Sequence, residues 1–261
     1  MSEFAKSKDG TRVAYDREGT GPAVILVGGA MQFRGFDPTT AAMAGMLADR
    51  GFTVVNYDRR GRGESAGATS FALADELDDL AALIDEVGGD AALFGSSSGG
   101  AICLAAASAG LSVTKLALWE VPLGPENGTG GAEFFAGLRE RLDAGQNEAA
   151  VEYYMKDMPP QWLAGAKASP GWPIMVGLAP SLSADAESLA WAQSGPHAQL
   201  LASVTQPVLV IVGSSTLPLM SSAADAIVAA VPNGRTITIE GENHSWQPDV
   251  MADTLAEFFA G

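Results

Sequence analysis

Residues 91–110 read AALFGSSSGGAICLAAASAG and join two apolar runs through a turn of serine and glycine. The first run is apolar at successive positions, which is typical of a strand buried on both faces of a parallel sheet. The second run is rich in alanine and predicts a helix over 98–109. Within the turn, residues 95–99 read G-S-S-S-G and fit the pattern G-x-S-x-G with Ser97 at its centre.

This spacing has a physical reason. A serine on a tight turn from strand to helix is held in a strained backbone conformation with its hydroxyl exposed above the sheet. The residues two places before and after it must be small, and Gly95 and Gly99 occupy those places. The first N–H groups of the helix point to where negative charge develops. The pattern therefore predicts Ser97 as a nucleophile and Ser98 as an oxyanion donor; a turn without chemistry is the alternative.

The rest of the chain alternates short apolar runs with stretches of helical spacing. Strands are expected over 23–29, 53–58, 91–96, 115–121, 207–214 and 236–241, and further helices over 38–50, 73–87, 221–231 and 249–259. This alternation predicts an α/β fold with a mostly parallel, doubly wound sheet covered by helices on both sides. At the start, two alternating runs flank Asp9-Gly10 and predict an antiparallel hairpin at the sheet edge.

One region lacks the strand pattern. Residues 124–191 contain helical pieces separated by joints rich in proline and glycine. An all-helical insertion between two core strands predicts a cap over the carboxyl edge of the sheet. We therefore expect a core built from residues 1–123 and 192–261, interrupted by a helical cap over 124–191.

Three further stretches have recognisable patterns. Residues 57–65, YDRRGRGES, look like a D-x-R-G-x-G-x-S turn. Residues 241–246, GENHSW, place a histidine just past the last predicted strand. Residues 27–31, VGGAM, are similar to an H-G-x turn. Together with G-x-S-x-G, and in this order, they make nearly the whole chain resemble the α/β-hydrolase superfamily.

The resemblance implies a serine hydrolase with a G-x-S-x-G nucleophile elbow, a catalytic triad and an oxyanion hole. It implies that His244 is the general base and that the second oxyanion donor is the N–H of Ala30, with Gly29 as the fallback. An imidazole that titrates near neutrality suits the task of taking a serine proton. The chain has one other histidine, His197, which we interpret as a surface or capping residue.

The triad acid departs from the family pattern. The superfamily usually carries an Asp a few residues past the strand predicted at 207–214, where this chain has Thr216. A threonine cannot carry the charge that steadies an imidazolium. Glu120, after the neighbouring strand, is the best substitute, because some members of the superfamily place their acid there. A Ser-His dyad stays open, as does a Glu120 that is solvated or paired with Arg59 or Arg60.

Large apolar side chains are frequent in the predicted cap and beside the catalytic loops. Most of the cap residues are expected to form the core of the cap itself, but five of these side chains are the candidates for the wall of the substrate pocket: Met31, Trp162, Trp172, Leu217 and Trp246. Such walls favour an uncharged, apolar acyl or aryl substrate. The sequence has no P-loop, no dinucleotide glycine pattern and no cluster of metal-ligating residues, so we expect neither cofactor nor metal.

Composition limits the partners and the compartment. The net charge of −16 disfavours nucleic acid and anionic membranes, which bind basic patches. One cysteine, Cys103, allows no intrachain disulfide. The chain starts without a signal-peptide run and has no stretch of ~18 apolar residues. We expect a cytoplasmic protein that binds a small-molecule substrate; a homodimer is one option for its assembly.

These features predict hydrolysis of a small, largely apolar carboxylic ester, thioester or lactone through an acyl-enzyme. The same residues leave open perhydrolysis of the cofactor-free haloperoxidase type, hydrolysis of a carbon–carbon bond, or a lyase step, because a fold does not fix its chemistry. A ligand-binding protein without catalysis is a second alternative, and its support is the threonine at position 216.

Overall fold

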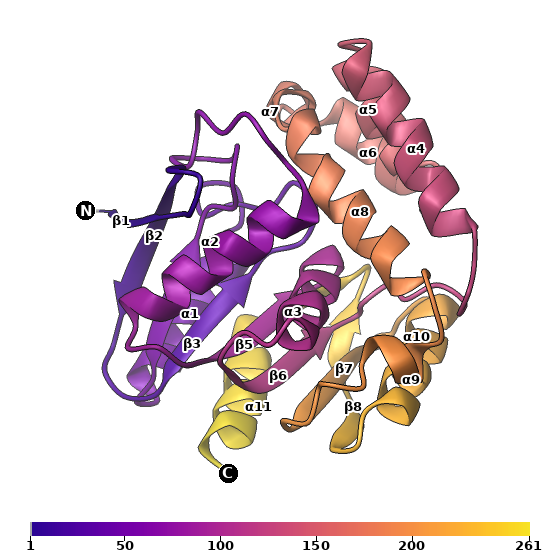
Figure 1. The fold of residues 1–261 in the computed structure, drawn as a ribbon. Coiled ribbons are helices and arrows are strands. Elements are labelled where there is room, and N and C mark those ends of the chain that lie inside the picture. The colour runs from indigo at the N-terminus through magenta and orange to yellow at the C-terminus, as the bar shows by residue number, and fades with distance from the viewer. Residues whose placement is uncertain (1) are drawn as a thin grey trace.

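A nine-stranded sheet forms the centre of the computed structural model, which describes residues 2–261 (Figure 1). Its strand order is β1-β2-β4-β3-β5-β6-β7-β8-β9. Strands β3 to β8 pair in parallel, while β1, β2 and β9 pair with antiparallel neighbours. The predicted α/β class and its N-terminal hairpin are confirmed. The strands are β1 Glu3–Lys6, β2 Arg12–Glu18, β3 Ala23–Val27, β4 Thr53–Tyr57, β5 Ala91–Ser96, β6 Val113–Trp119, β7 Val208–Ser215, β8 Gly234–Glu242 and β9 Ser245–Trp246.

Helices cover both faces of the sheet, with α1 and α11 on one face and α2, α3 and α10 on the other. Successive residues of the central strands β3, β4, β5 and β7 point to opposite faces and are mostly buried on each, which explains why these strands are apolar at successive positions. None of the described helices is both long and apolar enough to cross a bilayer. The helices are α1 Pro38–Asp49, α2 Leu73–Glu86, α3 Ser98–Ser108, α4 Gly130–Asp143, α5 Asn147–Tyr154, α6 Pro160–Ala168, α7 Trp172–Gly177, α8 Leu182–Ala192, α9 His197–Leu200, α10 Pro218–Ala230 and α11 Pro248–Ala260, with a 3-10 turn η1 at Ala179–Ser181.

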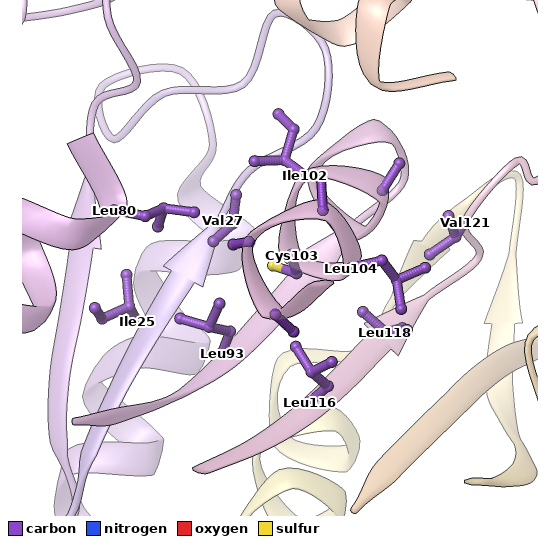
Figure 2. Packing of buried hydrophobic residues seen from close by; sticks show 14 of the residues in the cluster. Ile25, Val27, Leu80, Leu93, Ile102, Cys103, Leu104, Leu116, Leu118 and Val121 are labelled. Atoms are coloured by element: carbon purple, nitrogen blue, oxygen red, sulfur yellow. The ribbon is translucent and has the colours of Figure 1, made fainter. Parts of the chain in front are cut away.

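Helix α3 is buried along nearly its whole length (Figure 2). Its small alanine and glycine residues allow it to lie close to the sheet, where Ile102, Cys103 and Leu104 pack among side chains such as Leu93 and Leu116. Burial raises the pKa of the Cys103 thiol, which keeps it protonated and unreactive. The start of α3, and with it the turn at its N-terminus, is therefore fixed by close packing.

Helices α4 to α8 lie between β6 and β7 in the chain and gather beyond one end of the sheet (Figure 1). Their shared core contains residues of these helices and of the loop after β3, from which Met31 and Phe33 contribute. Helix α8 also packs against α2 and α3, so it joins these helices to the core.

Candidate active site

Ser97 lies at the junction of β5 and α3 with φ 55° and ψ −127°. This backbone conformation is unfavourable for a residue with a side chain and costs roughly 1–3 kcal/mol. Two hydrogen bonds hold it: the Ser97 N–H donates to the Trp119 carbonyl at 2.8 Å, and the Ser97 carbonyl accepts from the Gly100 N–H at 2.9 Å. The turn therefore has the strained geometry expected of a nucleophile elbow.

The close approach of strand and helix makes a test of the elbow possible. A Cβ atom at Gly99 would lie 2.4 Å from the Val27 carbonyl oxygen and 2.6 Å from that of Gly28, and backbone atoms there cannot yield. We expect Gly99→Ala to lower the free energy of unfolding by roughly 1–3 kcal/mol, measured by urea denaturation.

Gly165 in α6 is the matched control, because a Cβ atom there meets no other atom within 4 Å. Gly165→Ala should raise the free energy of unfolding by roughly 0.5–1 kcal/mol, because alanine is the better helix former. If Gly99→Ala were as stable as the wild type, the prediction that the backbone leaves no room for a side chain at Gly99 would be wrong.

His244 lies in a two-residue turn between β8 and β9. Glu242 and Ser245 pair across the hairpin, and the two turn residues have positive φ, 51° at Asn243 and 63° at His244. Two positive φ angles are what a tight type I′ hairpin requires, and asparagine tolerates them well. Histidine is also enriched at positive φ, so both turn residues suit the hairpin that positions this imidazole.

Glu120 follows β6 directly and is 3% exposed. Its Oε2 lies 2.5 Å from Nδ1 of His244, and the Gly213 N–H donates to its Oε1 at 3.0 Å. The structure thus brings together two residues that are 124 positions apart in the chain. The alternative that Glu120 is a solvated residue at a strand end does not fit this burial.

Pairing of Glu120 with the arginines at 59 and 60 does not fit either. The guanidinium of Arg59 binds Glu76 at 2.8 Å, and that of Arg60 binds Asp79 at 2.6 Å. All four of these groups are buried. The two arginines are therefore satisfied by other carboxylates, which leaves His244 as the ionisable partner of Glu120 among the described residues.

The charge state of Glu120 fixes the tautomer of the histidine. Burial raises the pKa of Glu120, but His244, the neighbouring Thr216 hydroxyl and the Gly213 N–H outweigh it, so the pKa lies below its usual range. Thr216 Oγ1 lies beside the carboxylate without a hydrogen bond of normal geometry. A charged carboxylate only accepts, so Nδ1 of His244 carries the donated proton. Nε2 then has the free lone pair that a general base needs.

Ser97 and His244 line one cavity of about 720 Å³ between the end of the sheet and the helices above it. Three of the predicted pocket residues lie in its wall: Met31, Trp162 and Leu217. The Trp162 ring stacks near the imidazole of His244, with centroids 6.3 Å apart and an interplanar angle of 27°. Other side chains in the wall include Gln32, Glu133, Phe134, Tyr153, Tyr154, Lys156, Asp157, Met158, Leu189, Gln193, Met220 and Asn243.

Two predicted pocket residues lie elsewhere, which corrects the expectation. Trp172 begins α7, where it is half-buried against the core of helices α4 to α8, and its Nε1 donates to Glu148 at 3.2 Å. Trp246 is buried under the hairpin, where its ring meets those of Phe94 and Trp119 edge-on at 5.7 and 5.4 Å. The strand β9 turns this side chain into the core instead of the cavity.

The loop after β3 contains the expected oxyanion donor. The Gly29 N–H donates to Gln32 Oε1 at 2.5 Å, so the fallback donor is already occupied. Ala30 lines the cavity, and no acceptor among the described residues takes its N–H or that of Ser98. These two N–H groups are the ones available to a substrate oxygen.

Backbone strain concentrates at this cavity. Six residues other than glycine have positive φ in the described chain, and five of them line the cavity or bind a residue that does. Strained conformations of this kind cluster at functional sites. The five are Met31, Ser97, Glu120, Asn243 and His244, and the sixth is Asn127.

The sequence interpretation missed Asn243 and Gln32. Asn243 could have been found, since an asparagine before a histidine at a strand end is a turn signal. Gln32 carries no such signal, because its role as an acceptor for Gly29 depends on the path of the loop.

Comparisons with known proteins show the family of the chain. The model of the alpha/beta hydrolase family matches residues 24–258. An alpha/beta hydrolase from Sphaerobacter thermophilus is 36% identical, with a TM-score of 0.85, and the match covers 98% of this chain and 100% of that one. None of the curated proteins compared with the chain matches it in sequence.

Two more distant structures share the fold. A thermophilic esterase from Thermogutta terrifontis is 22% identical with a TM-score of 0.72, covering 100% of this chain and 97% of that one. A putative non-heme bromoperoxidase from Mycobacterium tuberculosis is 21% identical with a TM-score of 0.70, covering 95% of each chain. The family model and the 36% identical structure together span almost every residue, and the chain therefore belongs to the alpha/beta hydrolase family.

Proposed function

We propose that the protein is a serine hydrolase that cleaves a small, largely apolar carboxylic ester, thioester or lactone through an acyl-enzyme on Ser97. The observation that carries the proposal is the 2.5 Å contact between Glu120 and His244 on the wall of the cavity that Ser97 lines. The family model and the 36% identical structure, which is described as an alpha/beta hydrolase, support a hydrolase. The ester specificity rests on the site itself.

The reaction would proceed in two halves. Ser97 Oγ attacks the carbonyl carbon while Nε2 of His244 takes its proton, and the charged Glu120 stabilises the imidazolium that forms. The tetrahedral oxyanion faces the N–H groups of Ala30 and Ser98, each worth about 3 kcal/mol in the transition state. His244 then protonates the leaving group, and a water molecule activated by the same base releases the acid.

The cavity wall favours a neutral substrate. Lys156 is the one cationic side chain among the described lining residues, and it forms an ion pair with Asp157. A substrate carboxylate would therefore find no free cation there, while Glu133 and the net charge of −16 would repel it. The wall also contains three methionines, four aromatic residues and three leucines, which suit an apolar acyl or alcohol group.

A fluorophosphonate probe tests the nucleophile directly. We expect one covalent adduct by intact-mass measurement, mapped by peptide digestion to Ser97, and no adduct on Ser97→Ala. Hydrolysis of p-nitrophenyl esters from acetate to decanoate then tests the substrate class. An unlabelled wild type, or a label on another serine, would contradict the proposal. Peracid formed from acetate and hydrogen peroxide faster than ester is hydrolysed would assign perhydrolysis instead.

A further inference from the structure

Helix α8 contains a buried carboxylate that the proposed mechanism does not use. Asp185 has no exposed surface. Its Oδ1 accepts hydrogen bonds from Arg59 Nη1 at 2.6 Å and from the Ser98 hydroxyl at 2.7 Å, and its Oδ2 accepts from Arg62 Nη2 at 2.6 Å. Three short, charge-assisted bonds fix such a group firmly.

The two arginines that bind Asp185 also hold the loop after β3. Arg62 donates through Nη1 to the Gly29 carbonyl at 2.6 Å, and Arg59 donates to the Gly28 carbonyl at 3.2 Å. These carbonyls belong to the residues that precede Ala30. The Gly29 carbonyl shares a peptide group with the Ala30 N–H, so a shift of Arg62 would move the first oxyanion donor itself. A shift of Arg59 would move the peptide group just before it.

The second donor is tied to the same carboxylate. The Ser98 hydroxyl donates to Asp185, and the Ser98 backbone N–H is the other group available to an oxyanion. Burial raises the pKa of Asp185, but the charges of Arg59 and Arg62 outweigh it, so the pKa is lowered and the carboxylate stays charged. One group on α8 thus binds Ser98 directly and reaches the loop after β3 through Arg59 and Arg62.

We propose that Asp185 is a positioning residue that sets the separation of the Ala30 and Ser98 N–H groups. It is not among the residues that line the cavity, so it would act on a substrate only through the two donors. The inference rests on the proposed function only because it assumes that a tetrahedral oxyanion forms at Ser97. Through Asp185, the packing of α8 against the core would then contribute to stabilisation of the transition state.

Asp185→Asn tests this role because it keeps the shape and removes the charge. Displaced donors lose part of the 10²–10³-fold that an oxyanion donor supplies, so we expect kcat to fall roughly 10- to 100-fold. KM should change little, since the donors act in the transition state. Affinity for a trifluoromethyl ketone, which forms a tetrahedral adduct, should fall in parallel with kcat/KM.

Asp79 offers a matched control. It is equally buried and binds Arg60 through both oxygens at 2.6 and 2.8 Å, but it makes no contact with the loop after β3. Asp79→Asn should lower the thermal midpoint as Asp185→Asn does, while kcat and affinity for the ketone stay at wild-type values. An equal fall of kcat in both variants would reduce Asp185 to a structural role, and an unchanged kcat in Asp185→Asn would overturn the proposal.

Ser98→Ala keeps the inference testable if Asp185→Asn does not fold. It removes the hydroxyl that binds Asp185 and leaves the backbone N–H, so a smaller loss of kcat is expected with an unchanged KM. The rate of phosphonylation of Ser97 is measured on the same proteins. If the probe labels the wild type but the wild type cleaves no ester, the proposed ester substrate would be wrong while the inference about Asp185 would still stand. Wild-type labelling rates in the variants would overturn the inference.

Discussion

Replacing His244 by glutamine is expected to lower kcat by about a millionfold, the loss seen when a triad base is removed. Glutamine has nearly the size of histidine but no lone pair that can take the Ser97 proton at neutral pH. The contact of Nδ1 with Glu120 leaves Nε2 as the base, so both functions of the imidazole are lost together. Turnover of a p-nitrophenyl ester, with folding checked by circular dichroism, measures the effect.

His197 is the control that the chain itself supplies. It is the other histidine, is 4% exposed, and begins α9, where its Nδ1 lies 3.6 Å from Glu126. It lines a separate cavity that does not include Ser97. His197→Gln should therefore keep the wild-type kcat, whatever it costs in stability. Similar losses in both variants, or an active His244→Gln, would show that the base has been misidentified.

Local sequence was enough to predict the elbow and the strands. The close approach of the backbone at Gly99 leaves no room for a side chain. The turn therefore requires small residues around Ser97, and this requirement is visible within five consecutive residues of the sequence. The strands could be predicted because helices cover both faces of the sheet, which makes their residues apolar at successive positions. The hairpin that carries His244 was not predicted, since β9 has two residues and its pairing leaves almost no periodic signal.

Side-chain direction was the weaker part of the prediction. Trp246 is two residues from His244 in sequence, yet it points into the core, because a strand sends its side chains alternately to opposite faces. Asp185 was missed altogether. Its partners Arg59 and Arg62 are 126 and 123 positions away, and only the three-dimensional seating of α8 brings them together. Contacts of such long range leave no local pattern to read.

Glu120→Gln is expected to lower kcat by about 10⁴-fold while the fold persists. The amide can donate a hydrogen bond to Nδ1, which would favour the tautomer with the proton on Nε2 and remove the base. It also lacks the charge that stabilises the imidazolium. Stopped assays with the same ester measure kcat, and a nearly wild-type value would exclude Glu120 from the mechanism.

The position of Thr216 makes a charge-relocation test possible. Its hydroxyl lies beside the Glu120 carboxylate, at the place where the usual family pattern has its acid. In the Glu120→Gln background, Thr216→Asp should therefore restore part of the lost kcat, because a carboxylate again faces Nδ1 of His244. Thr216→Asn in that background has nearly the same shape without charge and should restore nothing. Equal recovery with both would show that packing, and not charge, holds the imidazole.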